Sequence, residues 1–404
     1  MSTTSMLPDS AGGEVSGREQ LVSAARDLVP ALRRSSQEAE RAGQLPAEIA
    51  RSMHDAGFFG LHVPAALGGI AAPIGTAVEV YTELARGSGA AAWCASILST
   101  GGLVSGRFLQ AGRDELWTED PRAGVCGSTA PTGTGRRVPG GLRVSGTWQP
   151  VSGIHQARWL LSSVVVRGGA DDSPGVVAAA LPVQALRIER TWRMAGMAAT
   201  GSDSATADDV FVPGHLVAPF AALLSAGKGE HTVEPLLGAT AYSFSTVGAG
   251  AVLVGMGRAA LEHTLTALSR GKAVAGSTYT DARDAPSVRR DVAVAAQLVD
   301  TAGLHLARAA ADVQSGVEED RQLDLATRAR IRADLATISA SVRQAMGHLL
   351  DAGGARTFAL SSPVQQVWRD VEVLCRQPMF VPGISLDVYA RSLLRIQEQV
   401  VGLV

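Results

Sequence analysis

The chain has few cysteines. Its 404 residues include three, Cys94, Cys126 and Cys375, which lie far apart and form no Cys-x-x-Cys pair. Neither a disulfide framework nor a zinc site is therefore expected. The histidines show no metal-ligand spacing joined to a nearby acid, so we predict no bound metal. Free thiols are typical of a reducing compartment, and we expect a cytoplasmic protein.

An excess of charge of one sign is also missing. The 36 Lys and Arg residues nearly balance the 38 Asp and Glu residues, for a formal net charge of -2. No block of like charges is long enough to neutralise a phosphate backbone. The first residues lack the basic start and apolar stretch of a secretory signal, and no run of about 18 apolar residues occurs. Nucleic acid and membrane are therefore not expected as partners.

The sequence also lacks a nucleotide-binding signature. No Gly-x-Gly-x-x-Gly follows a predicted strand, so the chain has no evident nicotinamide site of its own. Apolar residues, in contrast, make up 46% of the sequence. A chain of this length and composition can bury a sizeable core and form two or three subdomains.

The hydrophobic period changes twice along the chain and divides it into three zones. After a predicted mobile lead-in at residues 1–16, residues 17–122 have a helical period. Residues 123–217 contain short valine-rich segments bounded by Gly, Pro and Asp, which predict strands joined by turns. Residues 233–404 return to long amphipathic helices, as in an antiparallel bundle. Apolar residues spaced three or four positions apart form one stripe, which predicts a single bundle helix: Ile331, Leu335, Ile338, Val342, Met346 and Leu349.

Four segments resemble the acyl-CoA dehydrogenase superfamily and stand in the same order. They are GFFGLHVPAALGG from Gly57, WQPVSGIHQARW from Trp148, TWRMAGMAATGSDSATADDVFVP from Thr191 and VWRDVEVL from Val367. More narrowly, they resemble its two-component (group D) flavin-dependent monooxygenase branch, over about residues 45–396. The resemblance implies an α+β, mostly α fold with an N-terminal helical domain, a middle β-barrel domain and a C-terminal four-helix bundle. It also implies a homotetramer.

The resemblance places a flavin against the turn within WQPVSGIHQARW. Ser152 matches a serine that lies beside the flavin N5 edge and helps to keep the oxygen adduct protonated, and Gly153 shares its turn. From the residues alone, this segment is a turn, and Trp148 is equally well explained by core packing. His155 is a candidate acid or base if it points inward past Ser152, and a surface turn residue otherwise.

Three further segments supply candidate cofactor residues. The Gly-Ser-Thr turn at Ser128 and Thr129 exposes N–H and hydroxyl groups that can hold a flavin, although such turns are also common loops. The resemblance puts Ser128 against the isoalloxazine. Thr200 and Ser202 lie in TGSDS, where the β domain meets the bundle, and a plain strand-to-strand turn is the alternative. Arg369, in VWRDVEVL, matches the arginine of the superfamily's Arg-Asp pair and is the last candidate cofactor-binding residue.

The catalytic base of the dehydrogenases is missing. Those enzymes abstract a proton with a glutamate that lies a few residues beyond this Arg-Asp pair or in the first bundle helix. Residues 374–379 and 243–247 contain no carboxylate. Phenol-hydroxylating relatives carry a histidine near Gln377 and often another near Thr100 or Gly101, and both are absent. Gln377 is therefore assigned to orienting a substrate that is already nucleophilic.

These observations together predict a flavin-dependent monooxygenase. Reduced flavin, FADH2 or FMNH2, comes by diffusion from a separate flavin reductase and reacts with O2. One oxygen atom then passes to a small nucleophilic substrate in secondary metabolism, such as an amine, an amino sugar, or an electron-rich aromatic or polyketide ring. Two alternatives stay open: an acyl-CoA dehydrogenase-like oxidase or desaturase, and an inert scaffold member of the family.

Overall fold

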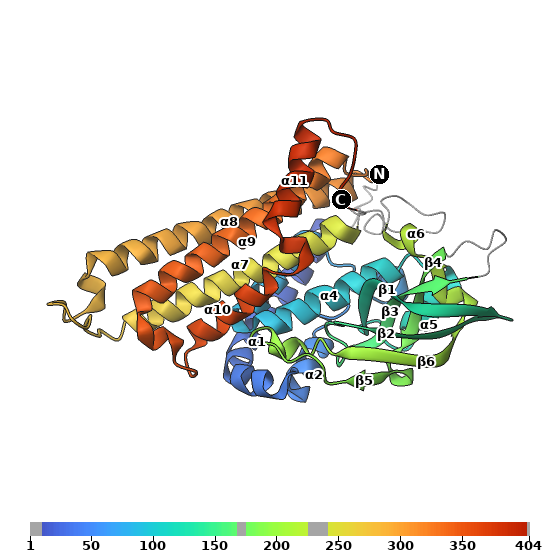
Figure 1. Ribbon diagram of the computed structural model, residues 1–404, viewed down its shortest axis with the longest axis horizontal. Helices are drawn as coiled ribbons and strands as arrows, with labels where there is room; N and C mark the ends of the chain where they lie inside the picture. Colours follow the sequence, from blue (N-terminus) through green and yellow to red (C-terminus); the bar gives the residue numbers. More distant parts are fainter. Residues whose placement is uncertain (1–9, 168–174, 225–240, 402–404) are drawn as a thin grey trace, which may run out of the picture.

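The computed structural model describes residues 10–167, 175–224 and 241–401, and Figure 1 shows a bundle of long helices with a sheet at one end. The N-terminal helices are α1 (Ser10–Ala42), α2 (Ala47–Asp55), α3 (Ile74–Gly87), α4 (Gly89–Ser105) and α5 (Gln110–Trp117). The strands are β1 (Gly124–Val138), β2 (Gly141–Trp148), β3 (Ala157–Val166), β4 (Gly175–Pro182), β5 (Arg187–Glu189), β6 (Ser204–Pro213) and β7 (Val217–Pro219). The C-terminal helices are α6 (Phe220–Leu224), α7 (Ala241–Leu268), α8 (Pro286–Glu318), α9 (Leu325–Gly353), α10 (Pro363–Leu374) and α11 (Pro382–Leu393).

The element order follows the predicted three zones of helices, strands and helices, and the fold is of the predicted mostly helical α+β class. The predicted lead-in differs, because α1 already begins at Ser10 and residues 10–16 are helical. Residues 1–9 lie outside the described part of the chain. So do residues 233–240 of the predicted C-terminal zone, whose first long described helix is α7.

The β domain is one seven-stranded sheet in the order β5-β6-β2-β1-β3-β4-β7. β1 and β3 run parallel, and the other neighbouring strands are antiparallel. β3 is valine- and leucine-rich and is buried along most of its length, as expected of a strand with both faces covered. Because β3 is the strand after the WQPVSG turn, its position fixes where that turn lies.

The bundle confirms the stripe predicted on residues 331–349, since all six of its members are buried on α9. α7 packs against α9, α8 and α3. The segment Tyr242–Leu268 of α7 is the one helix of the described residues with the length and composition to cross a membrane, but 83% of its most apolar window is buried inside the protein. That burial is expected of a core helix.

α4 joins the sheet to the bundle because its small residues allow close approach on two sides. Its N-cap Ser88 accepts a hydrogen bond from the N–H of Ala91 at 3.3 Å. A Cβ atom at Gly89 would lie 2.3 Å from the Met256 sulfur on α7, and one at Gly101 would lie 1.8 Å from the Val125 carbonyl oxygen on β1. The contact at Gly101 requires glycine because its neighbour is a backbone atom, whereas at Gly89 the Met256 side chain would have to move.

Candidate active site

Ser152 begins a chain of hydroxyl groups that links the WQPVSG and TGSDS turns. Its Oγ lies 2.8 Å from Ser202 Oγ, which lies 2.8 Å from Thr200 Oγ1. At one end the indole N–H of Trp93 donates to Ser152 Oγ at 3.1 Å. At the other, Thr200 Oγ1 donates to the Met197 carbonyl oxygen at 2.8 Å. Three predicted cofactor-site residues, Ser152, Thr200 and Ser202, are therefore brought together.

The two ends of this chain fix its direction. An indole N–H can only donate and a carbonyl oxygen can only accept. Thr200 uses its one proton on Met197, so it accepts from Ser202, and Ser202 in turn accepts from Ser152. Ser152 accepts from Trp93 and keeps one accepting lone pair unused by the chain. Thr200 and Ser202 are buried, whereas Ser152 is half-buried.

Trp93 connects this chain to the end of the bundle. It lies on α4, and its ring centroid is 6.3 Å from that of Phe380, which follows α10. Phe380 is fully buried in the short 3-10 helix Pro378–Phe380, and Gln377 is the N-cap of that helix. The structure thus places the backbone of Gln377 three residues from the ring that covers Trp93. Its assignment to substrate orientation stays a prediction.

The turn at Ser152-Gly153 follows the cis peptide bond Gln149–Pro150 and depends on glycine. Gly153 has a φ of 75°, in the left-handed region, and a Cβ atom there would lie 3.2 Å from the Leu98 side chain. Its N–H donates to the Thr200 carbonyl oxygen at 3.4 Å, which ties the two turns together through their backbones. The predicted Gly153 therefore shapes the turn that presents Ser152.

Ser128 and Thr129 lie on β1 where its pairing with β3 is interrupted. Ser128 pairs with Ser162, and the next paired residue of β1 is Gly133, so residues 129–132 form a bulge. Ser128 is buried and Thr129 is exposed. Gly124 and Gly153 both contact Leu98, so Ser128 lies four residues, or roughly 13 Å, along β1 from that point. The two serines can therefore contact only different parts of one extended ligand.

Trp148 is buried in the core, and its assignment to the cofactor site stays a prediction. Its side chain has no exposed surface, and its indole N–H donates to the Ser163 carbonyl oxygen at 3.1 Å. A Cβ atom at Gly133 would lie 2.4 Å from the Trp148 ring, so that glycine makes room for it. Of the two explanations weighed from the sequence, core packing is the one the geometry supports.

His155 is held by Asp203 and packs on the TGSDS turn. Its Nε2 lies 2.7 Å from Asp203 Oδ2, and a Cβ atom at Gly201 would lie 2.6 Å from its ring. Asp203 Oδ1 also accepts the N–H groups of Thr191 and Trp192, both at 2.9 Å. His155 therefore anchors the turn through Nε2, and proton transfer is left to Nδ1. Its catalytic role stays a prediction.

We expect Asp203→Asn to lower the free energy of unfolding by about 1–3 kcal/mol at pH 7. Burial raises the pKa of Asp203, but the hydrogen bonds from Trp192, His155 and Thr191 bring that pKa below its usual value. The carboxylate thus stabilises the fold above about pH 3.9, and that contribution is lost as the pH falls through the lower folded-state pKa. Urea unfolding at pH 7 and pH 3 should show the difference shrinking in acid. Asp208→Asn, at an exposed position on β6, should change little at either pH.

Arg369 connects three parts of the chain, and its assignment to the cofactor stays a prediction. Its guanidinium donates to the Glu40 carboxylate and to the Ala195 carbonyl oxygen, and its Nε donates to Gln365 Oε1 at 2.8 Å. These bonds connect α10 to α1 and to the loop between β5 and β6. The guanidinium is therefore already occupied by protein partners.

Two residues of the site escaped the sequence analysis. Trp93 lies in an apolar helix of small residues, and nothing in that local pattern separates an indole that faces Ser152 from a packing residue. Asp370, next to Arg369, accepts the backbone N–H of Met197 and so touches the end of the hydroxyl chain. The one sequence signal for Asp370 was its place in the Arg-Asp pair of VWRDVEVL. Among the described residues, no three His, Cys, Asp or Glu side chains lie close enough to hold a metal ion.

The comparisons with known proteins agree with this architecture. Residues 17–119 match the acyl-CoA dehydrogenase N-terminal domain, and residues 247–381 match the acyl-CoA dehydrogenase C-terminal domain. The chain is 31% identical over 370 residues to the oxygenase component of the FADH(2)-dependent resorcinol hydroxylase of Rhizobium sp. (strain MTP-10005), covering 88% of this chain and 90% of that one. It is 28% identical to the flavin-dependent monooxygenase oxygenase subunit HsaA of Rhodococcus jostii (strain RHA1), covering 85% and 90%.

Among solved structures, XiaF from Streptomyces sp., in complex with FADH2 and glycerol, superposes with a TM-score of 0.92 at 27% identity, over 97% of this chain and 99% of that chain. The chain therefore belongs to the acyl-CoA dehydrogenase family, in the branch of two-component flavin-dependent monooxygenases. It is an oxidoreductase, the oxygenase component of such a system.

Proposed function

We propose that this protein binds reduced flavin, FADH2 or FMNH2, from a separate reductase and uses O2 to hydroxylate an electron-rich aromatic substrate. The directed hydroxyl chain that ends in Ser152 is the observation that carries the proposal. Relatives named for resorcinol and indole-3-acetate support an aromatic substrate. An amine or amino sugar, and a place in secondary metabolism, are the finer alternatives that the experiments below separate.

The residues around Ser152 fit a flavin. The half-buried Ser152 keeps one accepting lone pair, the Gly153 turn is compact, and the exposed bulge after Ser128 offers backbone groups that do not pair with β3. Ser152 would hold one edge of the ring system and the Ser128–Thr129 segment another part. A bound reduced flavin supplies two electrons to O2, so that one oxygen atom enters the substrate and the other leaves as water.

The protein's own contribution is to orient groups and to exclude water. Trp93, which bonds to Ser152, and Phe380, which packs against Trp93, are buried aromatic side chains, and the Trp93 ring lowers the local polarity around the Ser152 hydroxyl. The hydroxyl of Ser152 is held by two bonds within the chain and does not need to reorganise during the reaction. Preorganised groups in a dry site favour oxygen transfer over release of hydrogen peroxide.

The substrate has to supply its own nucleophilic character. The segment Leu374–Phe380 contains no carboxylate or histidine, and neither does the stretch 243–250 of α7. The resemblance puts a histidine of phenol-hydroxylating relatives near Thr100 or Gly101, and at Gly101 the contact with the Val125 carbonyl leaves no room for a side chain. An electron-rich ring attacks an oxygen electrophile without prior removal of a proton. This argument also disfavours dehydrogenation of an acyl thioester, which requires a positioned base.

The proposal is tested by turnover with a flavin reductase, NADH and 18O-labelled O2, using resorcinol, indole and an aromatic amine as probes. We expect labelled hydroxylated product from at least one ring substrate, and none when the reductase is omitted. Labelled N-oxide would instead identify an amine as the substrate. Bleaching of copurified oxidised flavin by an acyl thioester would instead identify a dehydrogenase, and absence of flavin binding would identify a scaffold.

We expect Gln377→Ala to lower product formation by no more than about tenfold, roughly 1.4 kcal/mol, and to leave the pH profile unchanged. A glutamine side chain forms hydrogen bonds but does not exchange a proton near neutral pH. Gln377→His, with an ordinary pKa near 6.5, should add phenol hydroxylation if a missing base limits the substrate range. Initial rates from pH 6 to 9 check both variants. Loss of several orders of magnitude in Gln377→Ala would show that the chemistry takes place there.

We also propose a homotetramer. Large apolar side chains stay exposed on the bundle, with Leu304 on α8 at 73% exposure, Leu393 on α11 at 66% and Leu394 beside it at 71%. Contiguous exposed apolar patches mark surfaces that contact another protein, and Leu393 and Leu394 are adjacent in the chain. Contacts between copies through α8 and α11 would bury them.

A further inference from the structure

The loop between β5 and β6 lies directly on α10. The backbone at Gly196 is so close that a Cβ atom there would lie 2.2 Å from the Arg369 carbonyl oxygen. On one side of Gly196 the Ala195 carbonyl accepts from the Arg369 guanidinium, and on the other the Met197 N–H donates to Asp370 Oδ1. The position of this loop is therefore set by two consecutive residues of α10.

Met197 is the point where α10 meets the hydroxyl chain. Its φ of 54° is in the left-handed region, which residues other than glycine seldom adopt. Its N–H is bound by Asp370, while its carbonyl oxygen accepts from the Trp192 indole at 2.9 Å and from Thr200 Oγ1 at 2.8 Å. Asp370 therefore holds the residue on which the chain to Ser152 ends.

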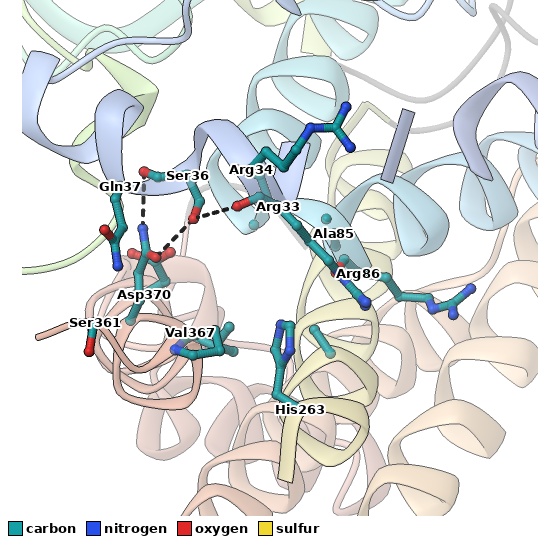
Figure 2. Close-up of a pocket in the computed structure, with 16 residues that line it drawn as sticks. Arg33, Arg34, Ser36, Gln37, Ala85, Arg86, His263, Ser361, Val367 and Asp370 are labelled. Atoms are coloured by element: carbon teal, nitrogen blue, oxygen red, sulfur yellow. Dashed lines mark hydrogen bonds between the residues drawn. The ribbon is translucent and has the colours of Figure 1, made fainter. Parts of the chain in front are cut away.

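The Asp370 carboxyl also lines a cavity of about 270 Å³ between α1, α7 and α10. Figure 2 shows Asp370 and Val367 on the α10 side of this cavity, with His263 of α7 and Arg86 across from them. The charged or titratable groups that face Asp370 across the cavity or lie next to it are Arg33, Arg34, Arg86, His263, Glu40 and Arg369. Asp370 therefore borders this cavity as well as the Met197 turn.

The pKa of the Asp370 carboxyl lies near neutral pH. Burial raises its pKa to about 7; the Met197 N–H opposes this shift, Glu40 adds to it and Arg369 opposes it. Burial and the nearby Arg33 lower the pKa of His263 to about 4, so His263 is neutral from pH 6 to 8. The carboxylate partners of Arg86 and Arg369 raise the pKa of both guanidinium groups, so these two side chains stay charged throughout this range.

We propose that Asp370 is a positioning residue for oxygen transfer, whose carboxylate fixes Met197 and thereby the Thr200–Ser202–Ser152 chain, and whose protonation loosens that chain. The inference rests on the proposed function. An ionised carboxylate accepts a shorter and stronger hydrogen bond than a neutral acid. Product yield per reduced flavin should therefore fall, and hydrogen peroxide should rise, as the pH drops through 7.

The structural part of the proposal is tested on the flavin-free protein by hydrogen–deuterium exchange of peptides spanning residues 194–203. After correction for the intrinsic pH dependence, exchange in the wild type should be about fivefold faster at pH 6 than at pH 8. Asp370→Asn, which keeps an accepting oxygen without the charge, should show the fast rate at both pH values. Asp334→Asn, which changes a buried aspartate held by His305 and Arg308 on α8, should leave these peptides unchanged.

The functional part is tested by product yield per reduced flavin between pH 6 and 8.5, with the ring substrate that the wild type accepts. Asp370→Asn should give the low acid-side yield at every pH, without an inflection near 7. Asp370→Ala should be about tenfold worse at pH 8, because the Met197 N–H then loses its acceptor. Glu40→Gln should move the inflection to lower pH, since Glu40 raises the pKa of Asp370.

The outcomes separate this proposal from the one on which it rests. Wild-type exchange rates and a wild-type pH profile in Asp370→Asn would overturn the positioning role while leaving the monooxygenase activity intact. Absence of product from every ring substrate and amine in the wild type would overturn the proposed function. The exchange experiment would then still decide whether Asp370 controls the Met197 turn.

Discussion

Replacing Ser152 with alanine should divert most of the reduced flavin from product to hydrogen peroxide. The product yield per reduced flavin is expected to fall by about 10- to 100-fold, which corresponds to roughly 1.4–2.7 kcal/mol of transition-state stabilisation. The reason is local: the Trp93 indole loses its acceptor, Ser202 loses its donor, and the proposed contact with the flavin is removed. Stopped-flow reduction followed by separate product and peroxide assays measures the ratio.

A matched control for this change is Thr147→Ala. Thr147 carries an exposed hydroxyl on β2 of the same sheet, where it bonds to Thr206 at 2.9 Å. Its loss should leave both folding and the product-to-peroxide ratio unchanged. A Ser152→Ala variant with a wild-type ratio would remove Ser152 from the site, because the fold offers no second hydroxyl bonded to both Trp93 and Ser202 within the described residues.

Gly101→Ala should lower the free energy of unfolding by about 3 kcal/mol or more. The added methyl group would lie 1.8 Å from the Val125 carbonyl oxygen, a backbone atom that can move only if β1 shifts away from α4. Because β1 also carries Ser128, flavin affinity should weaken along with stability. Urea unfolding and flavin titration measure the two effects.

Gly347→Ala is the control for replacing a helical glycine by alanine where no steric clash results. Gly347 lies within α9, and a Cβ atom there would meet nothing within 4 Å. Alanine favours a helix interior over glycine, so this variant should gain up to about 1 kcal/mol. Equal and small effects at both positions would contradict the close packing of α4 on β1. A histidine introduced at Gly101 should be worse than alanine, so a catalytic base cannot be added to this protein there.

The sequence predicted those features that depend on local pattern. The stripe on α9 was found because a helix buries every third or fourth residue, and the strand zone was found because Val-rich segments alternate with turn residues. The start of α1 was placed too late, because small polar residues there resemble an unstructured lead-in.

The site was predicted in part, for a physical reason. Ser152, Thr200 and Ser202 were selected separately, and only the packing of two turns reveals that they form one chain. Trp148 and Arg369 have residue types suited to a flavin site, and the sequence did not show that Trp148 bonds to Ser163 on β3 or that Arg369 bonds to Glu40 on α1. Side-chain direction across domains is a tertiary property, and a single sequence does not contain it.

The hydrogen bonds of the hydroxyl chain all run in one direction, which prevents proton transfer along it. A row of hydroxyls can relay a proton only if every bond in the row can reverse, which requires a terminal group that both takes and gives protons. Here one terminus is an indole and the other a peptide carbonyl, and neither exchanges a proton near neutral pH. A proton that arrives at Ser152 thus has no exit through Ser202 and Thr200. The hydroxyl chain therefore does not relay protons. Protons that the reaction produces or consumes must enter or leave through the substrate or the solvent.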